Sequence, residues 1–527
     1  MNAWRICLDK SILRYFQSTI WDESKLSQPK AWKALLLILL FAFVLRIFLI
    51  IFPEVIHNDA TEYIRHAKQI SSGDWSGGKA PPLYPLLIAG ARVITRNYEM
   101  AGIWVSVIFG TLIVLPIFYL GRAIFDEKVG FLSALFVAVH PFLYMSSGSV
   151  LTESTYHFLL ATSVLWGWYA FTRGRFSYIL LFSFFTTLAY LTRPEAIGFV
   201  FIFSIWVLLI NPPDVSRGWI KRVGVIILAI FGFLAFSSPY LVQIRKDTGK
   251  WGISKKATVS IGSLSGEEEA PSLETLRKKK GITLSSWIKY PLPVLGKIGT
   301  GIFGSLYKFQ QVYNPILFLL AVWGLTFLLK KKKPHSLKMS FYLMAYLFFF
   351  FGLVLPFFWV TRRYTSQMIS ISIPWAACGF LGVSEWIHQR FDGKGVRKRI
   401  PAILLIFLLV GLFIQGRVIH TREHRVIQRE VGLWMRENLP KESKVMSRLP
   451  QEAFYAEFPW VRMLSEEYEV ILGYARSKGV RYLLIGEDIE KISPRFWEKM
   501  RREDLVHVRD FKRKAQRIVI FEMVERD

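Results

Sequence analysis

Long apolar runs recur along most of the chain, and they restrict its fold more than any other feature. A helix needs roughly 20 apolar residues to cross a bilayer, and runs near that length recur up to residue 416, separated by charged or Gly/Pro-containing breaks. About eleven such runs can be counted, at approximately residues 34–52, 101–120, 129–145, 155–171, 178–191, 196–210, 223–240, 313–329, 339–360, 366–386 and 400–416. We therefore predict a mainly α, polytopic transmembrane bundle over residues 34–416. The fifth and sixth runs are parted only by residues 192–195, so a merged or re-entrant pair there stays open as an alternative.

The composition excludes an ordinary soluble protein. Apolar residues make up 52% of the chain and aromatic residues 16%, an excess that must face lipid. The formal charge of +28 would suggest nucleic acid in a soluble protein, but Lys and Arg concentrate in short segments between apolar runs, where membrane topology accounts for them. We therefore expect no nucleic-acid partner. The two cysteines, Cys7 and Cys378, indicate neither a disulfide framework nor a thiol metal site.

The basic loops indicate how the bundle is oriented. Lys and Arg gather in the tail at residues 1–33 and in the segments 172–175, 217–222, 330–333 and 390–399. With eleven spans these segments share one side, which the positive-inside rule makes cytoplasmic. The extracytoplasmic segments are then residues 53–100, 146–154, 192–195, 241–312, 361–365 and everything after 417. Loop 241–312 is itself basic, but long loops escape the rule.

The last 110 or so residues change character, from continuous apolar runs to alternating amphipathic helices and short strand-like runs. The expected helices are 426–438 and 466–478, and the expected strands are 444–448, 481–485 and 517–524. We therefore predict that residues 417–527 form a small soluble α/β domain outside the cytoplasm. It carries no Gly-rich phosphate loop, metal-ligand spacing or nucleophile motif, so an accessory role is the preferred interpretation.

The first extracytoplasmic loop begins with a dense polar cluster that includes His57. On a helix, Asp59, Glu62, Tyr63 and His66 share one face, at offsets of three, four and seven residues from the first. A carboxylate at the membrane boundary beside an aromatic hydroxyl is suited to accept a proton from an alcohol. The alternative is a solvated amphipathic helix lying on the lipid surface.

Two further polar groups precede the fourth span. Lys79 stands just before the proline-rich stretch 80–85, which fixes a rigid turn, and it can meet an anionic head group or simply snorkel to the interface. Glu153 lies in the short loop before the fourth span. An ionisable group at that depth is costly and indicates a site or a pair, although N-terminal capping by Thr152, Glu153 and Ser154 competes as an explanation.

Arginines supply the cationic candidates. Arg193 lies between the fifth and sixth spans, and Arg363 with Tyr364 follows the ninth. Arginine suits a phosphate because its planar fork donates two hydrogen bonds at once. The structural alternatives are a local pair of Arg193 with Glu195 and lipid head-group anchoring after the ninth span. Since all these acids and cations fall on one predicted face, acid groups and phosphate binders converge there.

The order of these features resembles the GT-C glycosyltransferases, in the branch of the protein O-mannosyltransferases and lipid A aminoarabinose transferases. In that branch an acidic residue is followed four positions later by an aromatic one, here Asp59 and Tyr63. A Pro-Pro-Leu turn follows, here at 81–83, and then a second acid after the third span, here within 149–155. The stretches 188–196 and 363–364 are also similar. The resemblance covers most of residues 34–386, and the C-terminal domain is similar to those of many bacterial relatives. In two departures, Ala60 replaces a commonly adjacent acid and Ala80 separates Lys79 from the prolines.

The resemblance implies an inverting transfer of a sugar from a polyprenyl-phosphate donor to a protein, lipid A or glycan acceptor at the outer face of a cell membrane, the inner membrane in a bacterium. The implied catalytic residues are Asp59, Glu153 and Glu62, and the implied substrate-binding residues are His57, Tyr63, Lys79, Arg193, Arg363 and Tyr364. No cofactor is assigned, although a carboxylate pair can bind a divalent metal ion. A transporter or flippase of a lipid-linked or anionic substrate is the alternative; it predicts two matching halves, and no such repeat is evident.

Overall fold

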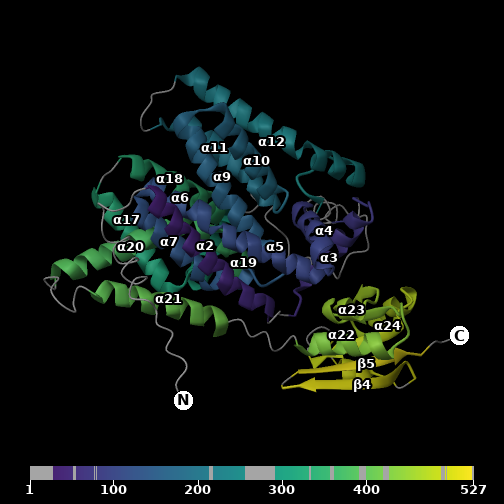
Figure 1. Cartoon of the computed structure of the whole chain (residues 1–527). Helices are drawn as coiled ribbons and strands as arrows, with labels where there is room; N and C mark the ends of the chain where they lie inside the picture. The colour runs from purple at the N-terminus through teal and green to yellow at the C-terminus, as the bar shows by residue number, and fades with distance from the viewer. Residues whose placement is uncertain are drawn as a thin grey trace, which may run out of the picture.

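The computed structural model describes most of the chain outside its N-terminal tail. The described residues are 28–51, 55–75, 78, 80–212, 218–255, 291–331, 334–355, 361–390, 399–418 and 426–524, without 488, 490–492, 494, 502 and 515. A helical bundle occupies the part up to residue 418, and a small mixed domain follows it (Figure 1).

Helices coincide with every apolar run that the sequence predicts to span. They are α2 (Gln28–Ile51), α5 (Tyr98–Leu112), α6 (Val114–Ile124), α7 (Glu127–Val139), α8 (Pro141–Ser146), α9 (Glu153–Arg173), α10 (Phe176–Tyr190), α11 (Ile197–Leu209), α12 (Trp219–Thr248), α16 (Pro291–Tyr313), α17 (Pro315–Lys331), α18 (Pro334–Phe348), a π-helix (Phe349–Val354), α20 (Ile369–Arg390) and α21 (Ile400–Val418). The pair around residues 192–195 forms two helices, α10 and α11, joined by a 3-10 turn (Pro194–Ala196), so it is not merged into one helix. The predicted mainly α bundle is confirmed.

Proline divides some of these runs. The run 129–145 is split because Pro141 has no N–H to donate to the preceding turn, so α7 ends at Val139 and α8 begins with the proline. Within the described residues, four helices are long and apolar enough to cross a membrane individually, or up to five when the pair 299–313 and 315–329, bent by 108°, counts as one. The chain is a multi-pass membrane protein, and eleven crossings stay a prediction.

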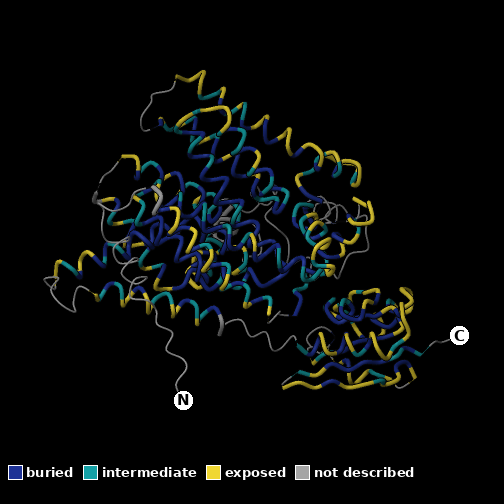
Figure 2. The backbone as a smooth tube through the Cα atoms, viewed as in Figure 1, coloured by how far each residue is buried: buried dark blue, intermediate teal, exposed yellow. Residues whose placement is uncertain are grey.

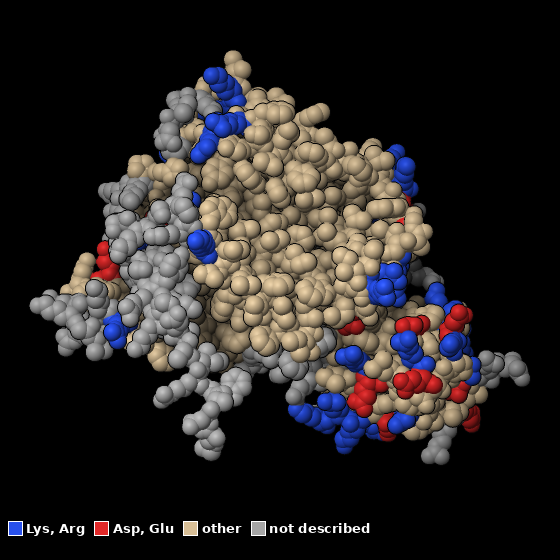
Figure 3. Space-filling model, viewed as in Figure 1, with Lys and Arg blue, Asp and Glu red and all other residues tan. Residues whose placement is uncertain are grey.

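The outer surface of the bundle is apolar where lipid would cover it. Large side chains such as Leu36 on α2, Phe231 on α12 and Phe407 on α21 are 65%, 68% and 71% exposed. Buried backbone runs through the middle of the bundle (Figure 2). Figure 3 shows a broad bundle surface with few charged side chains, beside a C-terminal domain covered by both signs of charge.

The loop predicted at 53–100 contains two helices, α3 (Asn58–Ser71) and α4 (Leu83–Thr95). Helix α3 was expected from its polar periodicity, whereas α4 was not. The prolines that indicate a rigid turn also start α4, because proline is tolerated in the first turn of a helix. Tyr63 and Tyr84 meet edge to face, with ring centroids 5.4 Å apart, so the two helices share one apolar cluster.

The C-terminal domain contains a five-stranded sheet in the order β2-β1-β3-β5-β4. Its strands are β1 (Val445–Ser447), β2 (Trp460–Arg462), β3 (Tyr482–Gly486), β4 (Leu505–Arg513) and β5 (Gln516–Met523), and its helices are α22 (Val426–Asn438), α23 (Gln451–Ala456), α24 (Tyr468–Ser477) and α25 (Phe496–Lys499). β1 pairs in parallel with β2 and β3, while β5 pairs antiparallel with β3 and β4. The predicted α/β character is confirmed; β2, β4, α23 and α25 were not anticipated.

Candidate active site

Asp59 stands in the first turn of α3. His57 occupies the N-cap position with an extended backbone, and its Nδ1 accepts a hydrogen bond from the Asp59 amide at 3.4 Å. The buried face of α3, which includes Ala60 and Tyr63, packs on the apolar cluster and leaves the Asp59 side chain 44% exposed. Its Oδ2 accepts a hydrogen bond from Nη1 of Arg363 at 2.6 Å. The carboxylate is therefore held at one oxygen while the side chain stays accessible.

Glu153 opens α9 and is the buried centre of the site. Its side chain is 2% exposed, and Oε1 accepts hydrogen bonds from Nε of Arg363 at 2.5 Å and from Nη2 of Arg193 at 3.0 Å. Arg363 comes from the short helix α19 (Arg362–Thr365). One guanidinium therefore links the exposed Asp59 to the buried Glu153. We call Asp59, Arg363, Glu153 and Arg193 the acid–arginine chain.

Arg193 is fixed on several sides. Because Pro194 disfavours a helical conformation at the residue before it, Arg193 is extended and α10 ends before it. Its Nε donates to Thr152 Oγ1 at 3.1 Å, and its Nη1 lies 3.5 Å from Glu195. Of the two sequence interpretations of Arg193, the local pair with Glu195 is present, and phosphate binding stays a prediction; the long-range contact with Glu153 was not anticipated.

Aromatic rings and one amide complete the surroundings of Arg193. Its guanidinium carbon lies 5.6 Å from the ring centre of Tyr156 and 5.8 Å from that of Tyr364, distances at which a cation is attracted to the ring face. Gln367 donates to Glu195 at 2.9 Å. Tyr156 and Gln367 were missed from the sequence, although Tyr156 follows Glu153 at a same-face helical offset of three.

The electrostatics of the cluster favour ionised carboxylates. Burial acts to raise the pKa of Asp59, but the charge and hydrogen bond of Arg363 outweigh it, so the pKa lies below its ordinary value. Three carboxylates, of Asp59, Glu153 and Glu195, face the two guanidiniums of Arg193 and Arg363. These five side chains together carry a formal charge of −1.

Some of the predicted site residues lie outside the acid–arginine chain. Glu62 pairs with Arg65 one turn along α3, at 2.7 Å. His57 caps α3, and Tyr63 packs against Tyr84, so the positions of both are explained by the fold of this loop. Lys79 lies outside the described residues.

A metal ion does not fit the described residues of this cluster. No group of three or more His, Cys, Asp and Glu side chains in the described segments is arranged to hold one. Asp59 and Glu153, the carboxylate pair considered from the sequence, both bind Arg363. The cation facing these acids is therefore a guanidinium.

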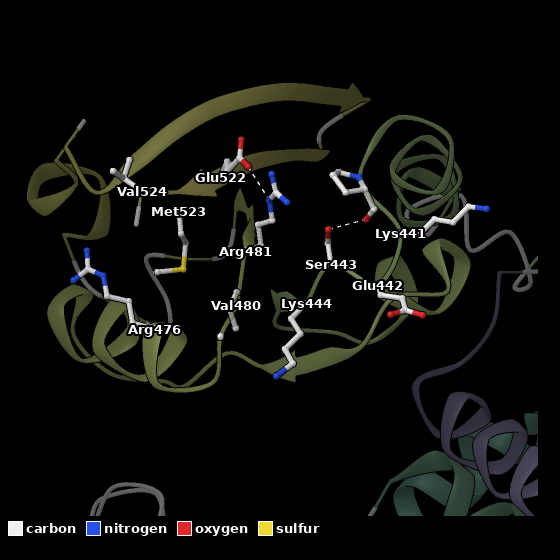
Figure 4. Close-up of a pocket in the computed structure, with 12 residues that line it drawn as sticks. Lys441, Glu442, Ser443, Lys444, Arg476, Val480, Arg481, Glu522, Met523 and Val524 are labelled. Atoms are coloured by element: carbon white, nitrogen blue, oxygen red, sulfur yellow. Dashed lines mark hydrogen bonds and ion pairs between the residues drawn. The ribbon is translucent and has the colours of Figure 1, made fainter. Parts of the chain in front are cut away.

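A concave region lies on the C-terminal domain. Its lining includes Lys441, Lys444, Arg476, Arg481 and Glu522 (Figure 4). Arg481 donates to Glu522 at 2.9 Å, and Arg476 donates to Asp504 at 2.7 Å. Both arginines there are already paired with carboxylates, and none of these residues belongs to the acid–arginine chain.

Comparison with solved structures identifies the architecture. The chain is similar to ArnT from Cupriavidus metallidurans bound to undecaprenyl phosphate, with a TM-score of 0.58 and 10% identity over 93% of this chain and 98% of that one. It is also similar to the oligosaccharyltransferase AglB from Archaeoglobus fulgidus in complex with an inhibitory peptide and a dolichol-phosphate, with a TM-score of 0.58 and 12% identity over 87% and 70%. The chain therefore has the GT-C fold, as the sequence predicts.

Sequence comparison adds a family match. Residues 79–242 match the model of the dolichyl-phosphate-mannose-protein mannosyltransferases. The matched segment contains Glu153 and Arg193, while Asp59 precedes it and Arg363 follows it. A comparison with curated protein sequences yields no match.

Proposed function

We propose that the chain is a membrane glycosyltransferase that moves a sugar from a polyprenyl-phosphate donor to an acceptor hydroxyl at the extracytoplasmic face, with inversion at the anomeric carbon. The observation that carries this proposal is the acid–arginine chain, in which an accessible carboxylate, Asp59, and a buried one, Glu153, are joined by Arg363. Buried charge of this kind is costly, and it is retained where it serves a site.

Asp59 is the candidate base. The acceptor oxygen attacks the anomeric carbon as the bond from that carbon to the phosphate oxygen breaks. The acceptor proton passes to Asp59, and polyprenyl phosphate leaves with the bonding electron pair. A carboxylate with a lowered pKa is a weak base, so it takes the proton late, when bond formation has already acidified the hydroxyl. Asp59 therefore first orients the acceptor.

Glu153 is better suited to hold the arginines than to act as a second base. It is almost fully buried, and one of its oxygens accepts hydrogen bonds from both guanidiniums. Arg363 uses two of its five N–H donors on these carboxylates. Its remaining donors are the candidates for binding an oxygen of the departing phosphate, a role that needs alignment and positive charge above all.

The phosphate requires more positive charge than the described cluster offers. Three carboxylates already face two arginines there, so an anionic donor would be repelled without another cation. Lys79, four residues before α4, is our candidate for that cation. A lysine contributes a compact, strongly charged ammonium group that can bind phosphate without bidentate geometry.

Two further observations support a polyprenyl carrier and an extracytoplasmic site. ArnT binds undecaprenyl phosphate and AglB binds a dolichol-phosphate, so a carrier of this chemical class suits the fold. The Lys- and Arg-rich short loops lie on the side opposite to Asp59 in the predicted topology, and this supports an extracytoplasmic site. The acceptor class is a protein, lipid A or glycan hydroxyl.

Direct assay of donor consumption tests the proposal. The purified protein is incubated with a panel of polyprenyl-phosphate sugars and membrane acceptors, and release of the free carrier phosphate is measured. We expect one or more donors to be consumed and Asp59→Asn to lower kcat by roughly 10²- to 10⁴-fold while the protein stays folded. Glu62→Gln removes an acid from the same helix and should keep most of the turnover, because Glu62 pairs with Arg65.

Two outcomes would contradict the proposal. Absence of consumption across the whole panel would count against sugar transfer. Movement of an intact carrier across a proteoliposome bilayer, without cleavage of its sugar bond, would favour the transporter alternative.

A further inference from the structure

The C-terminal domain contacts the backbone that leads into Asp59. The Tyr455 hydroxyl, on α23, accepts a hydrogen bond from the Ile56 amide at 3.0 Å and donates one to Glu99 at 3.1 Å. Ile56 lies 399 positions from Tyr455 in the sequence and three residues before Asp59. A single hydroxyl therefore connects this domain, the start of α5 and the segment before α3.

A second side chain of α23 holds the same segment. Gln451 is fully buried, and its Nε2 donates to the Ile56 carbonyl at 3.4 Å and to Oδ1 of Asn58, the first residue of α3. Tyr455 and Gln451 together therefore bind both backbone polar groups of Ile56. Because Ile56 is only 3% exposed, loss of these bonds would leave buried backbone groups unpaired, which is unfavourable.

Apolar packing reinforces the contact, and α23 is firmly held within its own domain. Tyr455 belongs to the same buried cluster as Val55, Ile56 and Tyr63. Helix α22 approaches α23 so closely that a Cβ at Gly432 would lie 2.5 Å from the Glu452 carbonyl oxygen. Hydrogen bonds and packing against α23 therefore both restrain residues 55–58.

We propose that Tyr455 and Gln451 are positioning residues for Asp59: the C-terminal domain fixes the Ile56–Asn58 backbone and so sets where Asp59 meets Arg363 and the acceptor. This inference rests on the proposed function, and it assigns the domain a part in the reaction. Asp59 directly follows the fixed backbone, so a shift of residues 56–58 moves its carboxylate. A misplacement of about 1 Å can cost roughly 100-fold in rate.

The test uses conservative variants in the full-length protein. Tyr455→Phe removes the hydroxyl and keeps the ring, whereas Gln451→Glu places a carboxylate against the Ile56 carbonyl. Tyr474→Phe is the matched control, because Tyr474 lies on α24 and packs on a different cluster of the same domain. Amide hydrogen exchange of residues 55–63 reports the backbone without any need for turnover, and exchange of β3 reports whether the domain is folded.

The expected result separates positioning from general destabilisation. Tyr455→Phe and Gln451→Glu should speed exchange at residues 55–63, leave β3 protected, and lower kcat about 10- to 100-fold with little change in the KM for the donor. Tyr474→Phe should match the wild type in all three measurements.

Each contrary outcome identifies what fails. Wild-type protein that consumes no donor contradicts the proposed function, while the exchange measurement still tests the backbone contact. An active wild type with Tyr455→Phe and Gln451→Glu indistinguishable from Tyr474→Phe overturns the positioning role. A fall in kcat accompanied by loss of β3 protection also overturns it, because the effect would then be unfolding of the domain.

Discussion

Arginine–carboxylate pairs occur in both the bundle and the C-terminal domain, but they differ in how far they are buried. In the bundle, Glu153 is 2% exposed and bridges two arginines that are distant in sequence. In the C-terminal domain, pairs such as Arg517 with Asp510 lie on the surface, with side chains 51% and 40% exposed. Exposed pairs gain little because water screens them, whereas buried ones persist only with mutual, well-formed partners.

The C-terminal domain also contains the counterexample, a buried acid. Glu452 on α23 is 5% exposed, and its Oε2 has no hydrogen-bond partner within the described segments. Burial raises the pKa of this carboxyl to about 8. Glu153 in the bundle is therefore held between two arginines, whereas burial keeps Glu452 in the domain protonated at neutral pH; Asp504, a further buried acid of the domain, pairs with Arg476.

Removing the centre of the acid–arginine chain should have the largest effect. Glu153→Ala leaves Arg193 and Arg363 without their shared partner in a buried site. We expect a loss of about 3–5 kcal/mol in the free energy of unfolding, together with loss of turnover. Thermal unfolding in detergent measures the first, and an unchanged Tm would show that the pairs contribute nothing to stability.

The buried neutral acid predicts a pH dependence of the C-terminal domain. Because the pKa of Glu452 in the folded state, about 8, lies above its ordinary value of 4.5, the folded state binds this proton more tightly. The resulting stability is fully present below about pH 4.5 and is lost as the pH rises to about 8. Glu452→Gln should remove this dependence and stabilise the domain at pH 9 by on the order of a few kcal/mol. Hydrogen exchange of β3 across this range checks it, and parallel curves for the two proteins would contradict it.

Lys79 tests whether the negatively charged cluster needs an added cation. We expect Lys79→Ala to raise the KM for the donor about tenfold, equivalent to about 1.4 kcal/mol, with a smaller effect on kcat. Lys68→Ala is the control, since Lys68 lies over the Tyr98 ring, 5.9 Å from its centre. Equal KM values for the two variants would remove Lys79 from the proposed phosphate site.

The smallest effect is expected for a surface pair. Arg517→Gln removes the 2.7 Å contact with Asp510 on adjacent strands. The free energy of unfolding of the domain should fall by less than about 1 kcal/mol, and by less still in high salt. Exchange of β3 provides the measurement. If Arg517→Gln lowered the free energy of unfolding as much as Glu153→Ala does, the expected difference between exposed and buried pairs would be wrong.

The sequence by itself determined the local features of this protein. Apolar runs placed the helices, because helix formation and lipid contact depend on neighbouring residues. Amphipathic and strand-like patterns also predicted α22, α24, β1, β3 and β5. Short motifs indicated Asp59, Glu153, Arg193 and Arg363 as separate candidates, since each is a polar group at the end of an apolar run. The helix α4 was missed because its prolines were interpreted as a turn alone.

Only the tertiary structure decided the partners of these side chains. Arg363 joins Asp59 and Glu153 across 304 and 210 positions of sequence, and Glu62, on the same helical face as Asp59, pairs instead with Arg65. Residues 55–58 likewise meet α23 across nearly 400 positions. Helical periodicity fixes which face a side chain occupies, but its partner depends on which distant segment packs there and excludes water.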